Sequence, residues 1–228
     1  MTRDVPHHPA LVSSTIGIAI AVGVLVMVLD NDTSIEPLAV LACGLGVLAG
    51  STGLRRRGFR VTGFGGSVFG GLVALIPLWL YAREDIPELI LLTVVFGVVG
   101  TIILTIGLLP TDGPGSRLLV KLGTGGLFVA VLLAAVGDVS DRAILLAGIG
   151  TILVWDAAEH AINVGEHLGT TAGTVSIELI HVAASSAIGA GALVLVLVFT
   201  QITPGDLSLV QFMGVLGTIV LFTLALHE

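Results

Sequence analysis

Apolar runs of about 20 residues recur along almost the whole chain, and a helix that crosses a bilayer needs a run of about that length. The runs and their short polar connections use up the 228 residues, so 1–228 is predicted to be a single transmembrane domain. The pattern predicts an all-α fold, a polytopic membrane helix bundle with about eight antiparallel transmembrane helices and short loops. The predicted segments are about 10–29, 37–54, 61–82, 88–109, 118–136, 142–168, 173–199 and 207–227.

Composition agrees with a chain that uses lipid as its solvent. Hydrophobic residues make up 55% of the sequence and charged residues only 11%, against roughly 25% charged in a typical soluble domain. The net charge of −7 argues against nucleic acid as a partner, because binding of nucleic acid needs clustered basic residues. Lys121 is the single lysine, and acidic loops poor in lysine are typical of a halophilic host.

The distribution of basic residues predicts the orientation in the cell membrane. Loops on the cytoplasmic side carry an excess of Lys and Arg, and this rule is met when both termini are cytoplasmic. Arg83 and Arg142 then lie outside. The basic residues on the inner side are Arg3, Arg55, Arg56, Arg57, Arg60, Arg117 and Lys121. The cluster formed by Arg55, Arg56, Arg57 and Arg60 is interpreted as a topology signal, with binding of anionic lipid head groups as the alternative.

Glycine pairs and aromatic residues within the spans predict packing and depth. Gly46-x-x-x-Gly50 and Gly66-x-x-x-Gly70 lie in the second and third segments, and small residues at this spacing let membrane helices approach closely. Trp79 and Tyr81 stand at the outer end of the third segment, where an aromatic belt is expected.

Polar side chains gather on the sixth and seventh segments, and ionisable residues within membrane helices are expected to be functional. Asp156, His160, Asn163 and His167 fall within roughly 60° of one another on a helix of 3.6 residues per turn. We call the whole set the polar hairpin. Its members are Asp156, Glu159, His160, Asn163, Glu166, His167, Glu178, His181 and Ser185.

Folding an antiparallel hairpin about the turn near Gly169–Gly173 places polar residues of the two helices at matched depths. The geometry predicts four pairs: His167 with Thr174, Asn163 with Glu178, His160 with His181, and Asp156 with Ser185. The cluster is expected to open towards the cytoplasm.

Three interpretations of the polar hairpin are compatible with its residues. The first is a hydrogen-bonded seam that fixes the register of two helices. The second is a divalent metal site in a membrane enzyme or sensor, with a mixed nitrogen and oxygen shell from Asp156, His160, Glu178 and His181, and with Glu159 as the alternative carboxylate to Glu178. The third is a small ion or proton pathway along acid–histidine pairs, although no ionisable residues continue it through the outer halves of the helices.

The hairpin sequence resembles a family of uncharacterised haloarchaeal multi-pass membrane proteins, known as a domain of unknown function. The matching residues are Trp155-Asp156-x-x-Glu159-His160, Gly165-Glu166-x-Leu168-Gly169 and Glu178-Leu179-x-His181. Genes of this family often stand beside those of MoxR-type AAA ATPases, so the resemblance implies a membrane-associated AAA ATPase system as partner. It assigns no catalytic residue. The sequence therefore favours a structural or partner-binding membrane component over an enzyme, and it does not indicate the oligomeric state.

Overall fold

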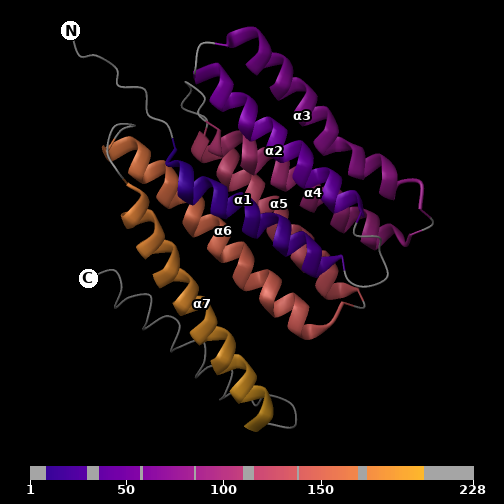
Figure 1. Ribbon diagram of the computed structural model, residues 1–228. Helices are drawn as coiled ribbons and strands as arrows, with labels where there is room; N and C mark the ends of the chain where they lie inside the picture. The colour runs from indigo at the N-terminus through magenta and orange to yellow at the C-terminus, as the bar shows by residue number, and fades with distance from the viewer. Residues whose placement is uncertain are drawn as a thin grey trace. The chain divides into compact units, whose positions relative to one another are not determined.

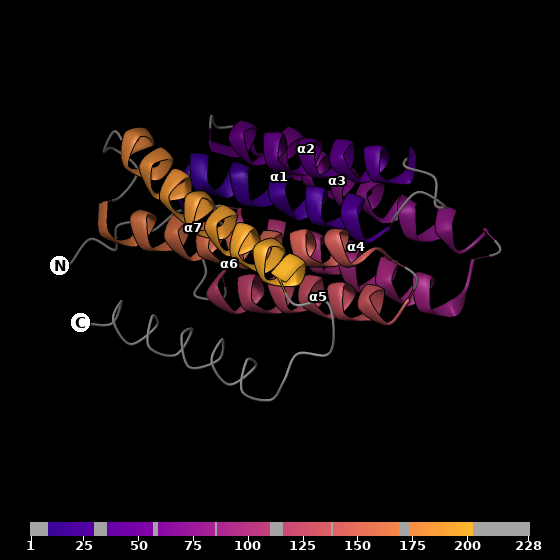
Figure 2. The ribbon, with the colours of Figure 1, turned by 90° about the horizontal axis from the view of Figure 1, so that it is seen from below.

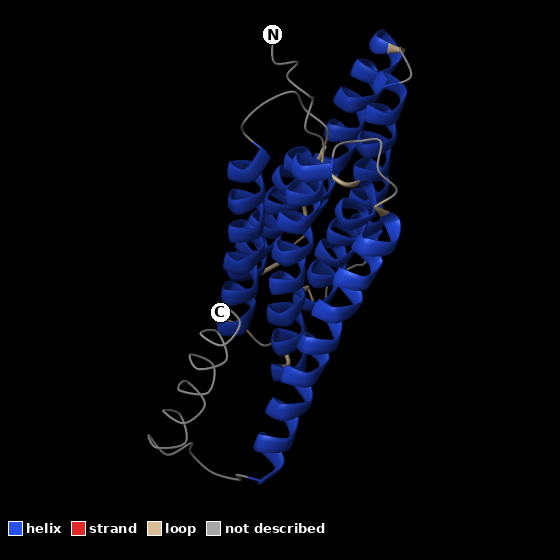
Figure 3. Ribbon diagram, turned by 90° about the vertical axis from the view of Figure 1, so that its left-hand side faces the viewer, coloured by secondary structure: helices blue, strands red, loops and turns tan. Residues whose placement is uncertain are grey.

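The computed structural model describes residues 9–29, 36–56, 59–84, 86–109, 116–137, 139–168 and 174–202. In this part of the chain the regular structure is all helical, without strands (Figure 3). The helices are α1 (Leu11–Val28), α2 (Glu36–Arg56), α3 (Arg60–Tyr81), α4 (Glu88–Leu108), α5 (Ser116–Val136), α6 (Asp141–Leu168) and α7 (Val175–Ile202).

The prediction of a membrane helix bundle is confirmed. Six of the described helices are long and apolar enough to cross a membrane, and α2 has a shorter apolar stretch, Glu36–Ser51. The protein is therefore a multi-pass membrane protein. The eighth predicted span, 207–227, lies outside the described residues, so the predicted count of eight stays a prediction.

The chain divides into two compact units, Met1–Gly189 and Ala190–Glu228. The first unit contains α1 to α6 and the first half of α7, and all residues of the polar hairpin belong to it. The described part of the second unit is the end of α7, up to Ile202.

Within the first unit, helices pack as antiparallel neighbours. α2 packs on α3, and α1 packs on α6 (Figure 1). α4 and α5 form a second close pair, which is also seen from below (Figure 2). α1 contacts α4 and α5 as well as α6, so the N-terminal helix lies against α6, which carries most residues of the polar hairpin.

Glycines allow the two closest helix pairs to form. A Cβ atom on Gly44 of α2 would lie 2.5 Å from the backbone nitrogen of Ala74 in α3. A Cβ atom on Gly123 of α5 would lie 2.5 Å from the backbone nitrogen of Leu104 in α4. Both pairs of backbones are therefore closer than any larger residue allows, as is typical of small residues at membrane helix interfaces.

The glycine prediction is right for α3 and wrong for α2. Gly66 and Gly70 of α3 pack against Ser51 and Leu48, but Gly46 and Gly50 meet open space. Gly44 is the α2 glycine that faces α3. Because each residue turns the helix by about 100°, a glycine two positions further on points to nearly the opposite side.

The two residues of the predicted aromatic belt differ in their exposure. Trp79 is 55% exposed, whereas Tyr81 is fully buried in the core of the first unit. Two residues along a helix again separate the side chains by about 200°, so Trp79 and Tyr81 cannot face the same surroundings.

Candidate functional site

The polar residues of α6 lie in the second half of an unusually long helix. α6 has 28 residues, which corresponds to about 42 Å at 1.5 Å per residue, more than the roughly 30 Å of a bilayer core. Its polar side chains lie on two faces. One face meets α7 and the other meets α5, so the structure divides the predicted stripe into two separate sets of contacts.

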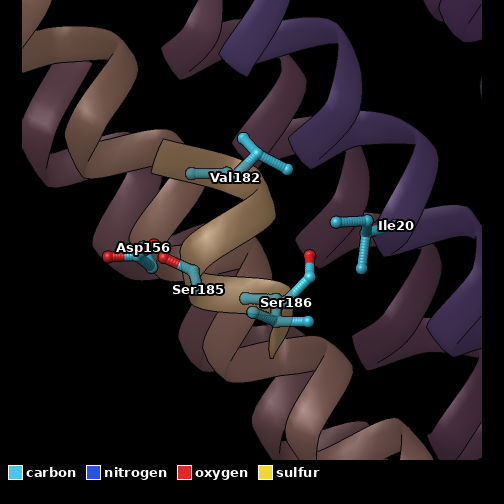
Figure 4. Close-up of a pocket in the computed structure, with 7 residues that line it drawn as sticks. Ile20, Asp156, Val182, Ser185 and Ser186 are labelled. Atoms are coloured by element: carbon cyan, nitrogen blue, oxygen red, sulfur yellow. Dashed lines mark hydrogen bonds between the residues drawn. The ribbon is translucent and has the colours of Figure 1, made fainter. Parts of the chain in front are cut away.

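The first set, which we call the histidine cluster, consists of Asp156 and His160 from α6 and His181 and Ser185 from α7. The Ser185 hydroxyl donates to Asp156 Oδ2 at 2.6 Å (Figure 4). The imidazole rings of His160 and His181 stack with their centroids 3.7 Å apart and their planes 7° from parallel. Two of the four predicted pairs, His160 with His181 and Asp156 with Ser185, are thus present in the structure.

The outer nitrogens of the stacked histidines have no hydrogen-bond partner. His160 Nε2 and His181 Nε2 are both shielded from solvent. His181 Nε2 lies 2.9 Å from Asp156 Oδ2, a charge contact when the ring is protonated, but the ring N–H does not point along this line. Such unpaired polar atoms are rare inside proteins. They are the groups of this cluster whose hydrogen bonding is not satisfied by the described residues.

Glu178 forms a separate contact with α1. Its carboxylate is 1% exposed. Oε2 accepts a hydrogen bond from the backbone N–H of Ser13 at 2.7 Å, and Oε1 accepts one from the Thr174 hydroxyl at 2.7 Å. The buried charge is therefore compensated by the N-terminal end of α1, because the free N–H groups at a helix start favour an anion.

The sequence at the start of α1 explains why this helix needs a partner. Its N-cap residue is Ala10, which has no side-chain acceptor for the free N–H groups of the first turn. Glu178 supplies that acceptor from α7. The backbone N–H of Ala10 itself donates to the Ala161 carbonyl of α6 at 2.8 Å. Side-chain capping of a helix start typically contributes about 1 kcal/mol, and here it also joins two helices.

A second set, the Arg117 clamp, joins α5 to the other polar face of α6. Arg117 Nη1 lies 3.1 Å from Glu159 Oε2, and Arg117 Nη2 lies 2.7 Å from Glu166 Oε2. Nη2 also donates to Asn163 Oδ1 at 2.7 Å, and Nε donates to Glu166 Oε1 at 3.3 Å. A single guanidinium thus holds three residues spaced i, i+4 and i+7 on α6, using the fixed fork of donors that arginine provides.

The other two predicted pairs are not formed. Asn163 faces Arg117 rather than Glu178, and Thr174 donates to Glu178 rather than meeting His167. His167 Nδ1 lies 2.8 Å from the backbone carbonyl of Asn163, one turn back on its own helix. The reason is that the polar stripe of α6 is wider than one helix interface. One side of the stripe faces α7 and the other side faces α5.

The four predicted metal ligands do not come together as a coordination shell. In the described part of the chain, no group of three or more His, Cys, Asp or Glu side chains is placed to hold a metal ion. Glu178 is turned to Ser13 and Thr174. The stacked rings of His160 and His181 carry their lone pairs in two parallel planes, whereas ligands of one metal ion must point to a common centre.

A narrow crevice borders the histidine cluster on the side of α1. It is lined by Ile20 from α1, by Leu153, Asp156 and Ala157 from α6, and by Val182, Ser185 and Ser186 from α7 (Figure 4). It has no room for the centre of a water molecule. The crevice is the line along which side chains of α1, α6 and α7 pack against one another.

The row of ionisable residues ends part-way along both helices. Between Arg142 and Asp156 on α6, the described residues include no ionisable side chain, and the same is true of α7 from Val182 to Ile202.

The predicted arginine cluster cannot be placed: Arg57 lies outside the described residues, and the side chains of Arg55, Arg56 and Arg60 lie outside them as well.

Sequence reasoning missed the partners that come from outside the hairpin. Ser13 and Ala10 were not expected at the site, and Arg117 was interpreted only as a topology signal. One sequence signal pointed to Ser13, because an apolar run preceded by Pro9-Ala10 starts a helix without a capping side chain. Arg117 could have been found as the basic residue at the same membrane end as Glu159 and Glu166.

These contacts define a class of protein: a multi-pass helical membrane protein in which a polar network ties α1, α5, α6 and α7 together. The chain belongs to the family of unknown function DUF7519, which matches residues 88–222. The match includes α4 to α7 and therefore every residue of the polar network except those of α1. It agrees with the resemblance to an uncharacterised family. No curated protein matches the chain, and no solved structure does.

Proposed function

We propose that the protein is a non-enzymatic component of a membrane assembly, in which the polar network holds α6 and the first half of α7 in a fixed register. One observation carries this proposal: Asp156, Glu159, Glu166 and Glu178 are each engaged by a donor from another helix of the same chain. Polar groups used in this way specify a helix arrangement.

The first half of α7 buries few of its large apolar side chains, and its closest contacts to the other helices are polar. Between Val175 and Gly189, Glu178 is the residue that is buried, Val182 is half-buried in the crevice, and the other large apolar side chains are exposed. Those exposed side chains are Val175, Ile177, Leu179, Ile180 and Ile188. This arrangement supports a role in partner binding, because it leaves one side of a firmly held helix available to another membrane segment.

The assembly that we propose is the membrane-associated AAA ATPase system implied by the family resemblance. The chain, purified in mild detergent from its host membranes, should elute together with that ATPase at a fixed ratio. Ile180→Trp enlarges the exposed side of α7 and should abolish co-elution, whereas Ile152→Trp on the exposed side of α6 should not. Free elution of wild-type protein, or equal behaviour of the two variants, would contradict the proposal.

The proposed orientation has both termini and the Arg55–Arg60 turn in the cytoplasm and the turn after α3 outside, in agreement with the excess of basic residues on the inner side. Ser140 is exposed just before α6. A cysteine at position 140, in a Cys43→Ser background, should react with an impermeant maleimide in intact cells. Reaction only after lysis would show that the orientation is opposite to the one proposed.

A further inference from the structure

An exposed arginine and tryptophan form a contact at the far end of α3, outside the polar network. Trp79 and Arg83 are four residues apart and therefore lie on the same side of the chain as it leaves the helix. The Arg83 guanidinium carbon sits 3.9 Å from the centre of the Trp79 ring. This cation–π contact holds a side chain that would otherwise move freely.

The contact uses one face of the guanidinium and leaves its edges available. Arginine has five N–H donors, and Arg83 donates none of them to an acceptor among the described residues and forms no ion pair with them. Arg117 by contrast donates four hydrogen bonds to α6. Arg83 is thus a positioned cation whose donors are not used by any of the described residues.

The position of Arg83 along the membrane normal indicates which groups can accept hydrogen bonds from its N–H donors. The apolar span of α3 ends at Tyr81, so Arg83 lies two residues beyond it, about 3 Å further along a helix axis. This is the depth of the lipid head groups, where tryptophan rings are enriched. The abundant anionic acceptor at that depth is the phosphodiester, and arginine binds phosphate through two parallel N–H···O bonds.

We propose that Trp79 and Arg83 form a binding site for the phosphate of an anionic phospholipid head group. The indole ring holds the guanidinium flat, so less conformational entropy is lost when the phosphate binds. The lipid tails then lie along the exposed apolar side of α3, which carries Leu72, Leu75 and Ile76. This site differs from the predicted arginine cluster of residues 55–60, which lies at the other end of α3.

Native mass spectrometry of the full chain in detergent, titrated with phosphatidylglycerol, tests the site. Arg83→Gln should weaken the tightest lipid binding by about fivefold, as expected for the loss of one basic contact at an anionic head group. Trp79→Leu and Arg83→Lys should each weaken it by a smaller factor, because they remove the stack or the planar fork but leave the remaining contacts. Arg142→Gln, at an exposed arginine with no stacked ring, is the matched control and should bind as wild type.

Two further titrations identify the ligand. Diacylglycerol, which has the tails without the phosphate, should not distinguish Arg83→Gln from wild type, and inorganic phosphate should not compete at concentrations that saturate the lipid. Competition by inorganic phosphate would mean that the site recognises free phosphate and would overturn the lipid assignment. Wild-type affinity in Arg83→Gln or in Arg83→Lys would overturn the site itself.

Discussion

Replacement of Gly123 by alanine should lower the free energy of unfolding by about 2 kcal/mol, since inserting a methyl group into a packed interface typically costs 1–3 kcal/mol. The added Cβ would lie 2.5 Å from the Leu104 nitrogen, 2.7 Å from the Gly100 oxygen and 2.7 Å from the Leu104 Cα. All three are backbone atoms, so no side chain can turn aside to make room. α4 and α5 must therefore move apart along the whole interface.

A matched control lies two residues further along the same helix. A Cβ atom on Gly125 would meet nothing within 4 Å, so Gly125→Ala should leave stability unchanged or raise it by about 0.5–1 kcal/mol, the usual difference in helix propensity. Unfolding of both variants by SDS in mixed micelles, followed by circular dichroism, measures the difference. If the two substitutions have equal effects, the close approach of α4 and α5 is not as described.

The glycines at these helix interfaces show what a sequence can and cannot predict about close packing. Glycine-rich apolar runs indicate that helices pack closely, as the structure shows between α2 and α3, for which the prediction was made, and also between α4 and α5. The sequence does not show which side of a helix faces its neighbour. Gly44 and Gly46 both look suitable, but only Gly44 points to α3, because the rotation of each helix is fixed by side chains elsewhere in the bundle.

The same distinction applies to the polar residues. The pairing of His160 with His181 and of Asp156 with Ser185 follows from the symmetry of an antiparallel hairpin, which involves only local sequence. Glu178 and Asn163 instead meet Ser13 and Arg117, which are 165 and 46 residues away in the chain. Contacts over such separations depend on the order in which helices pack, and periodicity within one helix contains no information about that order.

Burial adds a second reason why Glu178 could not be placed. A carboxylate near the end of an apolar span is expected to reach water, since long polar side chains at membrane ends usually turn towards the interface. Here the start of α1 provides an alternative to water: an uncapped helix end whose N–H groups are equally in need of a partner. Two unfavourable features of the sequence, a buried acid and a helix without a cap, compensate each other in the fold.

Glu178→Ala should therefore be strongly destabilising, by about 3 kcal/mol, because each buried donor left without a partner costs on the order of 1–3 kcal/mol. The substitution removes the acceptor of both the Ser13 N–H and the Thr174 hydroxyl. Glu178→Gln should cost less, about 1–2 kcal/mol, since the amide oxygen can still accept from the Ser13 N–H while the Thr174 hydroxyl must turn to accept from the amide N–H. It also removes the negative charge that interacts favourably with the start of α1.

Two measurements distinguish loss of this cap from a general loss of packing. Hydrogen exchange at the Ser13 amide should become faster in Glu178→Ala at conditions where the protein remains folded, while exchange in the middle of α4 should not change. Ser176→Ala removes an exposed side chain from the same turn of α7 and should match wild type in both SDS unfolding and exchange. Wild-type protection of the Ser13 amide in Glu178→Ala would show that α1 does not depend on this carboxylate, and α7 would then need another attachment.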